Sequence, residues 1–358
     1  MQTEEENSTM ECFHASYSCI SDMDRLFTLL KKQEGFLLSA SDKGKPYIVY
    51  VSDSPSHVDR SAPAAFTDEI MLNWKSERRP FCHIFWDNSY SVVSCQEIKA
   101  GSNYNLRDLG GYLNAQQDAV VKFGLLYRSD QPSSMGEEAT EVYKNLGLKT
   151  VLDLRGGYEH RMWPDPEIPG VTNYWLPALE ENPASPPEHV IVQSLSDIFK
   201  HDDSWKAEDA VRFSQSYLIM PFDNPAYKKM FSCLMNDEVP VMFHCLAGKD
   251  RTGIGAMLIL LALGIPEKTI LHDYMHRSLE YQNYIDFRAN ELREHLTTDI
   301  SVKHFSYFFG VLKENLEGSL NKIHELYGDA ETFLKESYGL GASDLDDLRK
   351  RYLLPIKL

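Results

Sequence analysis

An apolar run, a short loop that contains glycine and a second apolar run follow one another between residues 239 and 263. Residues 239–243 suit a buried parallel strand, and residues 254–263 suit a buried helix. The ten residues between these two runs read HCLAGKDRTG. A strand, a tight loop and a helix in this order aim backbone N–H groups and the positive end of the helix at one point. We therefore expect the loop to bind an oxyanion such as a phosphoryl group.

The residue types in this loop indicate covalent chemistry on the bound group. Gly248 and Gly253 permit the close approach and unusual dihedral angles that an oxyanion cradle requires. The amides, the helix dipole and Arg251 together favour the thiolate of Cys245, which is the candidate nucleophile. Arg251 offers a planar fork that can hold two phosphoryl oxygens, which lysine cannot do. Thr252 can donate its hydroxyl to the sulfur.

The remaining loop residues receive supporting roles. The candidate phosphate-binding residues are Leu246, Ala247, Gly248, Lys249, Thr252 and Gly253. We expect His244 to orient the loop through backbone hydrogen bonds and not to act as the base. Lys249 has two interpretations, which stay open: it reads a second phosphate of the substrate, or it is a solvated lysine that only tunes the field of the loop.

These residues resemble the signature of the cysteine-dependent protein tyrosine phosphatase superfamily, in which Cys and Arg flank five residues and His precedes the Cys. The fuller string is similar to the atypical tyrosine and phosphoinositide phosphatases of bacteria and fungi, including secreted mycobacterial and Listeria enzymes. The resemblance covers roughly residues 97–356 and implies hydrolysis of a phosphomonoester through a phosphocysteine intermediate. Other stretches in that family's order are residues 105–112, 127–129 and 153–155, then Glu159 and residues 273–274.

Two aspartates compete for the role of general acid, which typically contributes about 10²–10⁴-fold to the rate. Asp165 ends the tripeptide Trp-Pro-Asp that carries the acid in receptor-type tyrosine phosphatases, but it lies eighty residues before Cys245. Asp250 lies inside the loop, as in the atypical branch, where it donates the proton or orients the water. We favour Asp250 and keep Asp165 as the alternative; a merely structural Asp250 would brace Arg251.

Three charged residues at the carboxyl ends of predicted strands are candidate supporting residues. They are Asp153, Arg155 and Arg128, and ligands of open α/β sheets bind at such strand ends. They either line the mouth of the substrate site or form a buried charge network that holds the loop. For Asp108 with Arg107 we prefer the network.

Strands at residues 125–128, 150–154 and 239–243 alternate with a helix at 136–146, which predicts a parallel-rich α/β sheet flanked by helices. The expected organisation is a tail at 1–34, a small β module at 35–98 and a phosphatase domain at 99–358. Within the tail we expect a helix near residues 22–32. Within the phosphatase domain we expect a cap at 178–210, a helix at 214–234 and a helical part from Pro266. The module either binds an unknown partner or covers one edge of the catalytic sheet, and we favour the second.

Charge and cysteine usage limit the partners and the compartment. A net charge of −17 disfavours nucleic acid and tight adhesion to anionic membranes, and the apolar run at residues 254–265 is too short to cross a bilayer. The start of the chain lacks the features of a signal peptide, and the six cysteines show no disulfide or metal spacing. We expect a cytoplasmic protein, although a leaderless secreted effector would look the same.

The expected substrates are proteins phosphorylated on tyrosine, and also on serine or threonine, or phosphoinositides. No cofactor is expected, and no metal, because His272 and His276 lack an identifiable third ligand. Two alternatives stay open. One is a phosphatase of soluble inositol polyphosphates, and the other is a phosphate-dependent scaffold with vestigial catalysis.

Overall fold

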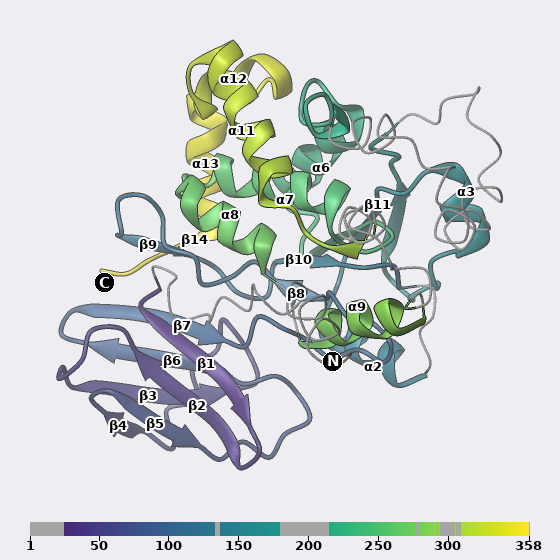
Figure 1. Cartoon of the computed structure of the whole chain (residues 1–358). Helices are drawn as coiled ribbons and strands as arrows, with labels where there is room; N and C mark the ends of the chain where they lie inside the picture. The colour runs from purple at the N-terminus through teal and green to yellow at the C-terminus, as the bar shows by residue number, and fades with distance from the viewer. Residues whose placement is uncertain are drawn as a thin grey trace, which may run out of the picture.

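A mixed five-stranded sheet forms the centre of the larger part of the molecule (Figure 1). The computed structural model describes residues 25–132, 137–179, 215–276, 279–291, 293, 305 and 309–357. The strand order is β12-β11-β13-β10-β8, with all neighbours parallel except the pair β10 and β8. The bounds are β8 Arg107–Asp108, β10 Leu126–Ser129, β11 Thr150–Asp153, β12 Thr172–Trp175 and β13 Val241–His244. The predicted parallel-rich α/β fold is confirmed.

The parallel register brings three strand ends to one level. His244 at the end of β13 lies beside Ser129 of β10 and Asp153 of β11. Segments that follow these strands therefore start from the same edge of the sheet, which is where ligands of α/β folds bind. This edge carries the loop at residues 245–249.

Helix α7 is the core element of this part. Its residues from Thr252 to Ala262 are all buried, as the continuous apolar run predicts. It packs on β13 and β10, and α8, α12 and α13 pack against it. The helices are α2 Glu137–Asn145, α3 Gly157–Met162, α6 Pro225–Met235, α7 Asp250–Ala262, α8 Glu267–Met275, α9 Leu279–Glu291, α11 Lys313–Tyr327, α12 Ala330–Tyr338 and α13 Ala342–Tyr352. No helix among the described residues is both long and apolar enough to span a membrane.

The expected helix at residues 214–234 is interrupted in the middle. Residues 215–217 are helical and residues 225–235 form the regular helix α6, but residues 218–224 between them are not helical. Asn224 caps its first turn by accepting a hydrogen bond from the N–H of Ala226, and Pro225 occupies the first helical position, where its missing N–H costs nothing. The expected cap at 178–210 lies outside the described residues from position 180 onward.

Residues 27–94 form a β sandwich of two small sheets with its own hydrophobic core (Figure 1). The sheet orders are β1-β2-β5 and β4-β3-β6-β7, with every neighbouring pair antiparallel. The strands are β1 Phe27–Lys32, β2 Gly35–Ala40, β3 Tyr47–Ser52, β4 Ala64–Phe66, β5 Glu69–Leu72, β6 Phe81–Trp86 and β7 Ser89–Ser94. The predicted hairpin between the last two strands is confirmed, with Asp87 at φ 45° in its turn.

The expected helix near residues 22–32 is wrong. Residues 27–32 form strand β1, while residues 22–24 lie outside the described part of the chain. Phe27 and Leu29 are buried and the residues between and after them are not, so the apolar pattern has period two. A tight turn at Gln33 and Glu34 then pairs β1 with β2. The sandwich therefore begins at Phe27 and not at residue 35.

The sandwich is joined to the central sheet at its β8 edge. Ile98 N–H donates to the carbonyl of Leu106 at 3.1 Å, so the segment that leaves β7 pairs with β8. Arg79 of the sandwich forms a buried ion pair with Asp108 of β8 at 2.7 Å. Both contacts place the sandwich and the segment that follows it along this edge of the sheet.

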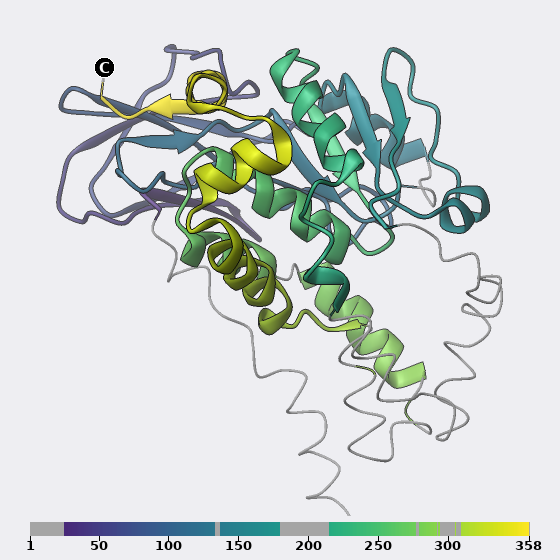
Figure 2. The same cartoon turned by 90° about the horizontal axis from the view of Figure 1, so that it is seen from above.

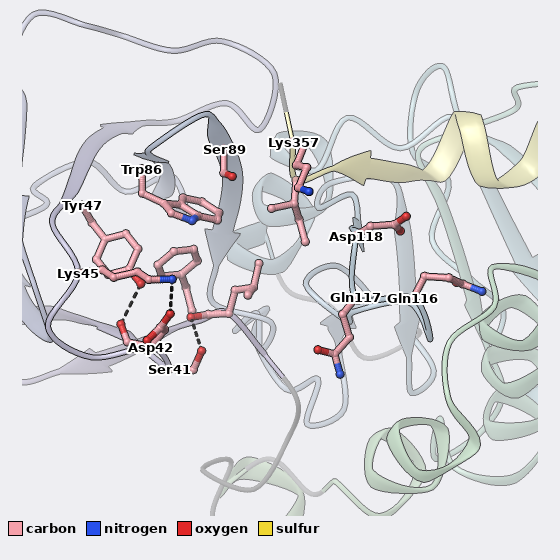
Figure 3. Close-up of a pocket in the computed structure, with 13 residues that line it drawn as sticks. Ser41, Asp42, Lys45, Tyr47, Trp86, Ser89, Gln116, Gln117, Asp118 and Lys357 are labelled. Atoms are coloured by element: carbon pink, nitrogen blue, oxygen red, sulfur yellow. Dashed lines mark hydrogen bonds and ion pairs between the residues drawn. The ribbon is translucent and has the colours of Figure 1, made fainter.

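The C-terminal strand makes a second junction. β14, Leu353–Pro355, pairs with β9, Ala119–Val121, and Figure 2 shows β14 running from α13 toward the sandwich. A cavity of about 340 Å³ lies at this junction, between the aromatic side chains of Tyr47 and Trp86 and the turn that contains Asp118 (Figure 3). None of its lining residues belongs to the loop that follows β13, so this cavity is separate from the candidate site.

Candidate active site

The loop at residues 245–249 connects the central strand β13 to the N-terminal end of α7. The predicted strand, loop and helix are therefore present in the expected order. β13 lies between β10 and β11, so the loop leaves the middle of the sheet edge. Because β13 is fully buried and α7 is buried from Thr252 onward, the loop is fixed at both ends.

Side chains from outside the loop hold its carbonyl groups. Asn105 Nδ2 donates to the carbonyl oxygens of Ala247 at 2.7 Å and Gly248 at 3.1 Å. Arg128 Nη2 donates to the same Gly248 oxygen at 2.9 Å. Carbonyls that are bound to the scaffold leave the N–H groups of the loop to form the concave, anion-binding side of the backbone.

Backbone contacts and two glycines fix the same segment. The N–H of Gln131 donates to the Leu246 carbonyl at 3.0 Å. Gly248 has φ 64°, and a Cβ there would lie 2.5 Å from a backbone oxygen of β10. A Cβ on Gly253 would lie 2.8 Å from the ring of Tyr274. Both positions therefore require glycine, for the reasons of backbone angle and close approach that the sequence suggested.

A buried charge cluster behind the loop is centred on Asp273 of α8. Its carboxylate accepts from Arg128 at 2.5 Å, from Tyr112 at 2.9 Å and, more weakly, from Arg107 at 3.5 Å. Burial raises the pKa of Asp273, but the two guanidinium groups lower it more, so the net pKa falls to about 2. Asp273 thus neutralises the arginine that holds Gly248.

Replacement of Asp273 by asparagine should destabilise the fold by about 3–5 kcal/mol, because it leaves two arginines buried without their counter-charge. A folded-state pKa of about 2 lies below that of an unfolded aspartate, so this stabilisation is complete above about pH 4 and disappears as the pH falls toward 2. Urea unfolding at pH 7 and at steps below pH 4 measures both effects. The difference between wild type and variant should shrink over that acid range.

The exposed Asp346 of α13 provides the matched control. Asp346→Asn should change the unfolding free energy by no more than about 0.5 kcal/mol, as is usual for a surface substitution. Equal stability of wild type and Asp273→Asn at pH 7 would rule out the charge cluster as a support of the loop.

A second buried cluster lies under the start of the loop. His244 donates from Nδ1 to the Cys245 carbonyl at 3.2 Å and from Nε2 to Asp165 at 2.8 Å. Burial lowers the pKa of His244, but Asp165 raises it more, and the net pKa is raised. A ring whose two nitrogens both contact acceptor oxygens suits the orienting role expected of His244 and not that of a base.

Arg155 completes this second cluster. It donates to Asp153 at 2.7 and 2.8 Å and to Asp165 at 2.7 Å, and its side chain has no exposed surface. Possible ligand atoms of Asp153, Asp165 and His244 lie within 4.8 Å of one another, but Arg155 already balances both carboxylates. Asp153, Arg155 and Arg128 therefore lie in buried charge networks and not at an open mouth.

Arg251 in the first turn of α7 is held by Glu159 of α3. Two hydrogen bonds join the guanidinium to the carboxylate, one of them from Nη2 at 2.8 Å. Burial lowers the pKa of Arg251, but the Glu159 charge raises it more, and Glu159 has a lowered pKa because Arg251 outweighs its own burial. Two hydrogen bonds to one carboxylate fix the plane of the Arg251 guanidinium group, which lies directly after the loop.

Asp250 is contacted by a tyrosine and a lysine. The hydroxyl of Tyr217 donates to Asp250 Oδ1, and Lys249 Nζ lies 3.5 Å from Oδ2. The Lys249 side chain is only 3% exposed, so the interpretation of a solvated lysine is wrong. Lys249 directly precedes α7, and its ammonium group faces the carboxylate of Asp250, the first residue of that helix. Asp250 itself keeps 20% of its side chain exposed and is thus accessible from solvent.

Cys245 at the start of the loop and Thr252 in the first turn of α7 are both buried. The Thr252 hydroxyl has no hydrogen-bond partner among the described residues. A buried hydroxyl without a partner is uncommon and costs about 1–3 kcal/mol. A thiolate or a phosphoryl oxygen bound in the loop would give this hydroxyl an acceptor.

Several residues of the site had no role assigned from the sequence. Asn105, Glu159 and Asp273 stand in the stretches that carry the family resemblance, which was the available signal. Tyr217 stands in none of them, and nothing in its neighbourhood in the sequence singles it out.

Comparison of the sequence with known proteins identifies a family. The sequence model of the tyrosine phosphatase family matches residues 98–354. A provisionally named tyrosine-protein phosphatase of Cupriavidus necator is 28% identical over 74% of this chain and 90% of its own length. The triple specificity protein phosphatase PtpB of Mycobacterium tuberculosis is 24% identical over 69% of this chain and 95% of its own. Since the family model spans well over half of the sequence, this chain belongs to the tyrosine phosphatase family.

Proposed function

We propose that this phosphatase hydrolyses phosphomonoesters through a phosphocysteine intermediate on Cys245, with phosphotyrosine proteins as its first substrates and phosphoinositides as its second. One observation carries the proposal. The loop that contains Cys245 has its carbonyls bound to Asn105 and Arg128, which leaves its amides for an anion.

In the first step the Cys245 sulfur attacks phosphorus, a sulfur–phosphorus bond forms, and the bond from phosphorus to the leaving oxygen breaks. Arg251 holds two of the equatorial oxygens, and its ion pair with Glu159 sets the plane in which it does so. Asp250 gives its proton to the leaving oxygen. The amides of the loop and the end of α7 stabilise the charge on the phosphoryl group.

In the second step a water molecule attacks phosphorus and the sulfur–phosphorus bond breaks. Asp250 accepts the proton of that water and is ready for the next cycle. The departing thiolate takes a hydrogen bond from Thr252, whose buried hydroxyl lacks any other described partner. Inorganic phosphate then leaves the loop.

The surroundings of the two aspartates favour Asp250 as the acid. Asp165 is nearly buried and accepts from both Arg155 and His244, so it has a structural task. Asp250 is partly exposed and begins α7, directly after the loop that contains Cys245. An acid that gives its proton to the leaving group and then takes one from the attacking water must be accessible to both.

A substrate panel tests the proposal. Phosphotyrosine, phosphoserine and phosphothreonine peptides, phosphoinositides in vesicles and soluble inositol polyphosphates are incubated with wild type and with Cys245→Ser. We expect phosphate release from phosphotyrosine peptides first and from phosphoinositides second, since the relative PtpB is named a triple specificity phosphatase. Release from inositol polyphosphates alone would establish the alternative enzyme, and binding without release would establish the scaffold.

A further inference from the structure

Two buried tyrosine hydroxyls lie in line behind Asp250. Tyr217 donates to Asp250 Oδ1, and its oxygen lies 2.8 Å from the hydroxyl oxygen of Tyr274. Tyr217 and Tyr274 belong to different parts of the chain, 57 residues apart, and both side chains are almost fully buried. The reaction described above assigns no role to either tyrosine.

The direction of the hydrogen bonds follows from the number of protons. Burial raises the pKa of both tyrosines well above its ordinary value, so each keeps its single hydroxyl hydrogen at neutral pH. Tyr217 uses its hydrogen on Asp250, so it can only accept from Tyr274. Tyr274 therefore orients the Tyr217 hydroxyl, and Tyr217 in turn orients the carboxyl group.

Packing fixes both rings. The Tyr274 ring lies so close to Gly253 of α7 that a Cβ there would clash with it at 2.8 Å. The backbone oxygen of Tyr217 accepts a hydrogen bond from Ser319 of α11 at 2.8 Å. The Tyr217 hydroxyl, which donates to Asp250, is thus held in place by α11 and, through Tyr274, by α7.

We infer that Tyr217 is a positioning residue for proton transfer, which holds Asp250 Oδ1 so that Oδ2 exchanges the proton with the leaving group and with water. Oδ2 is suited to this task because its ion pair with Lys249 Nζ, at 3.5 Å, is longer than an ordinary hydrogen bond. Tyr274 supports the arrangement by orienting Tyr217. This inference rests on the proposed role of Asp250 as the general acid.

The test is the dependence of kcat/KM on the leaving group. Phenyl phosphate needs protonation of its leaving oxygen, whereas 4-nitrophenyl phosphate releases a stable anion without it. In Tyr217→Phe we expect kcat/KM to fall about 10- to 100-fold for phenyl phosphate, the size of loss that a misplaced catalytic group causes. For 4-nitrophenyl phosphate the fall should stay below about threefold, since proton transfer contributes little there.

A second variant covers the chance that Tyr217→Phe does not fold. Tyr274→Phe keeps the Tyr217 hydroxyl but removes the group that orients it. We expect the same selective loss for phenyl phosphate, smaller in size. Circular dichroism and thermal unfolding establish that each variant is folded before its rates are compared.

Tyr352→Phe is the matched control. Tyr352 is equally buried and donates to the Leu234 carbonyl at 2.7 Å, on helices α13 and α6 and away from the loop. Its loss should leave the ratio of the two kcat/KM values unchanged. If Tyr217→Phe lowers kcat/KM for both substrates by the same factor, the role of Tyr217 is only structural and the inference is overturned.

Asp250→Asn separates failure of this inference from failure of the proposed function. It should lower kcat/KM for phenyl phosphate by about 10²–10⁴-fold, with a far smaller effect on 4-nitrophenyl phosphate. A selective loss in Asp250→Asn but not in Tyr217→Phe overturns the role of Tyr217 alone. No selective loss in Asp250→Asn overturns Asp250 as the acid, and the inference fails with it.

Discussion

Cys245→Ser should lose turnover of every phosphomonoester by on the order of 10⁶-fold, the effect that removal of a nucleophile has in a serine protease. The hydroxyl of serine is a far weaker nucleophile than a thiolate in a site without an adjacent general base. His244 cannot serve as such a base, because both of its ring nitrogens contact acceptor oxygens. Release of phosphate from a phosphotyrosine peptide, measured under excess substrate, gives the loss directly.

The variant should still bind substrate, because the proposed mechanism holds the phosphoryl oxygens with the loop amides and Arg251. Its Kd for the same peptide, measured by calorimetry, is expected to stay within about tenfold of the wild-type KM. Cys95→Ser is the control, since Cys95 directly follows β7 of the sandwich and donates to the Leu29 carbonyl, which serine can also do. Retention of more than about one-hundredth of the wild-type rate by Cys245→Ser would contradict the covalent mechanism.

The features that could be predicted from the sequence are those set by neighbouring residues. The strand β13, its loop and the helix α7 follow from one continuous stretch, where the apolar runs and the glycines determine the local backbone. The hairpin of β6 and β7 follows in the same way. Strand β1 was predicted wrongly because a six-residue apolar pattern is short enough to suit either period, and its pairing with β2 decides the outcome.

The support of the loop could not be predicted, because it depends on contacts between distant residues. Asn105 lies 142 residues before the carbonyl of Ala247 that it binds, and Glu159 lies 92 residues before Arg251. Sequence motifs indicate that such residues matter, but they do not say which atoms meet. Tyr217 is the extreme case, since it lies in no motif and reaches Asp250 only through the packing of α11 and α8.

The contact between Arg251 and Glu159 connects the fold to the chemistry. Glu159 is in the first turn of α3, where its carboxylate also accepts from the N–H of Gly156 at 3.0 Å. The position of Arg251 is therefore set by the helix that follows β11, while the nucleophile is set by β13. In the proposed mechanism β13 thus leads to both the nucleophile and the arginine, and the neighbouring strand β11 leads to the residue that positions the arginine.

Arg251→Lys should lower kcat/KM for a phosphotyrosine peptide by about 10³–10⁵-fold, the range that an arginine contributes to phosphoryl transfer when it stabilises the transition state. Lysine keeps the charge but cannot bond Glu159 and two phosphoryl oxygens in one plane. Arg349→Lys is the control, because Arg349 makes a similar pair with Glu331 at the surface, and its loss should leave the rate unchanged. A rate for Arg251→Lys within tenfold of wild type would show that a positive charge alone suffices and that the bidentate geometry has no part in catalysis.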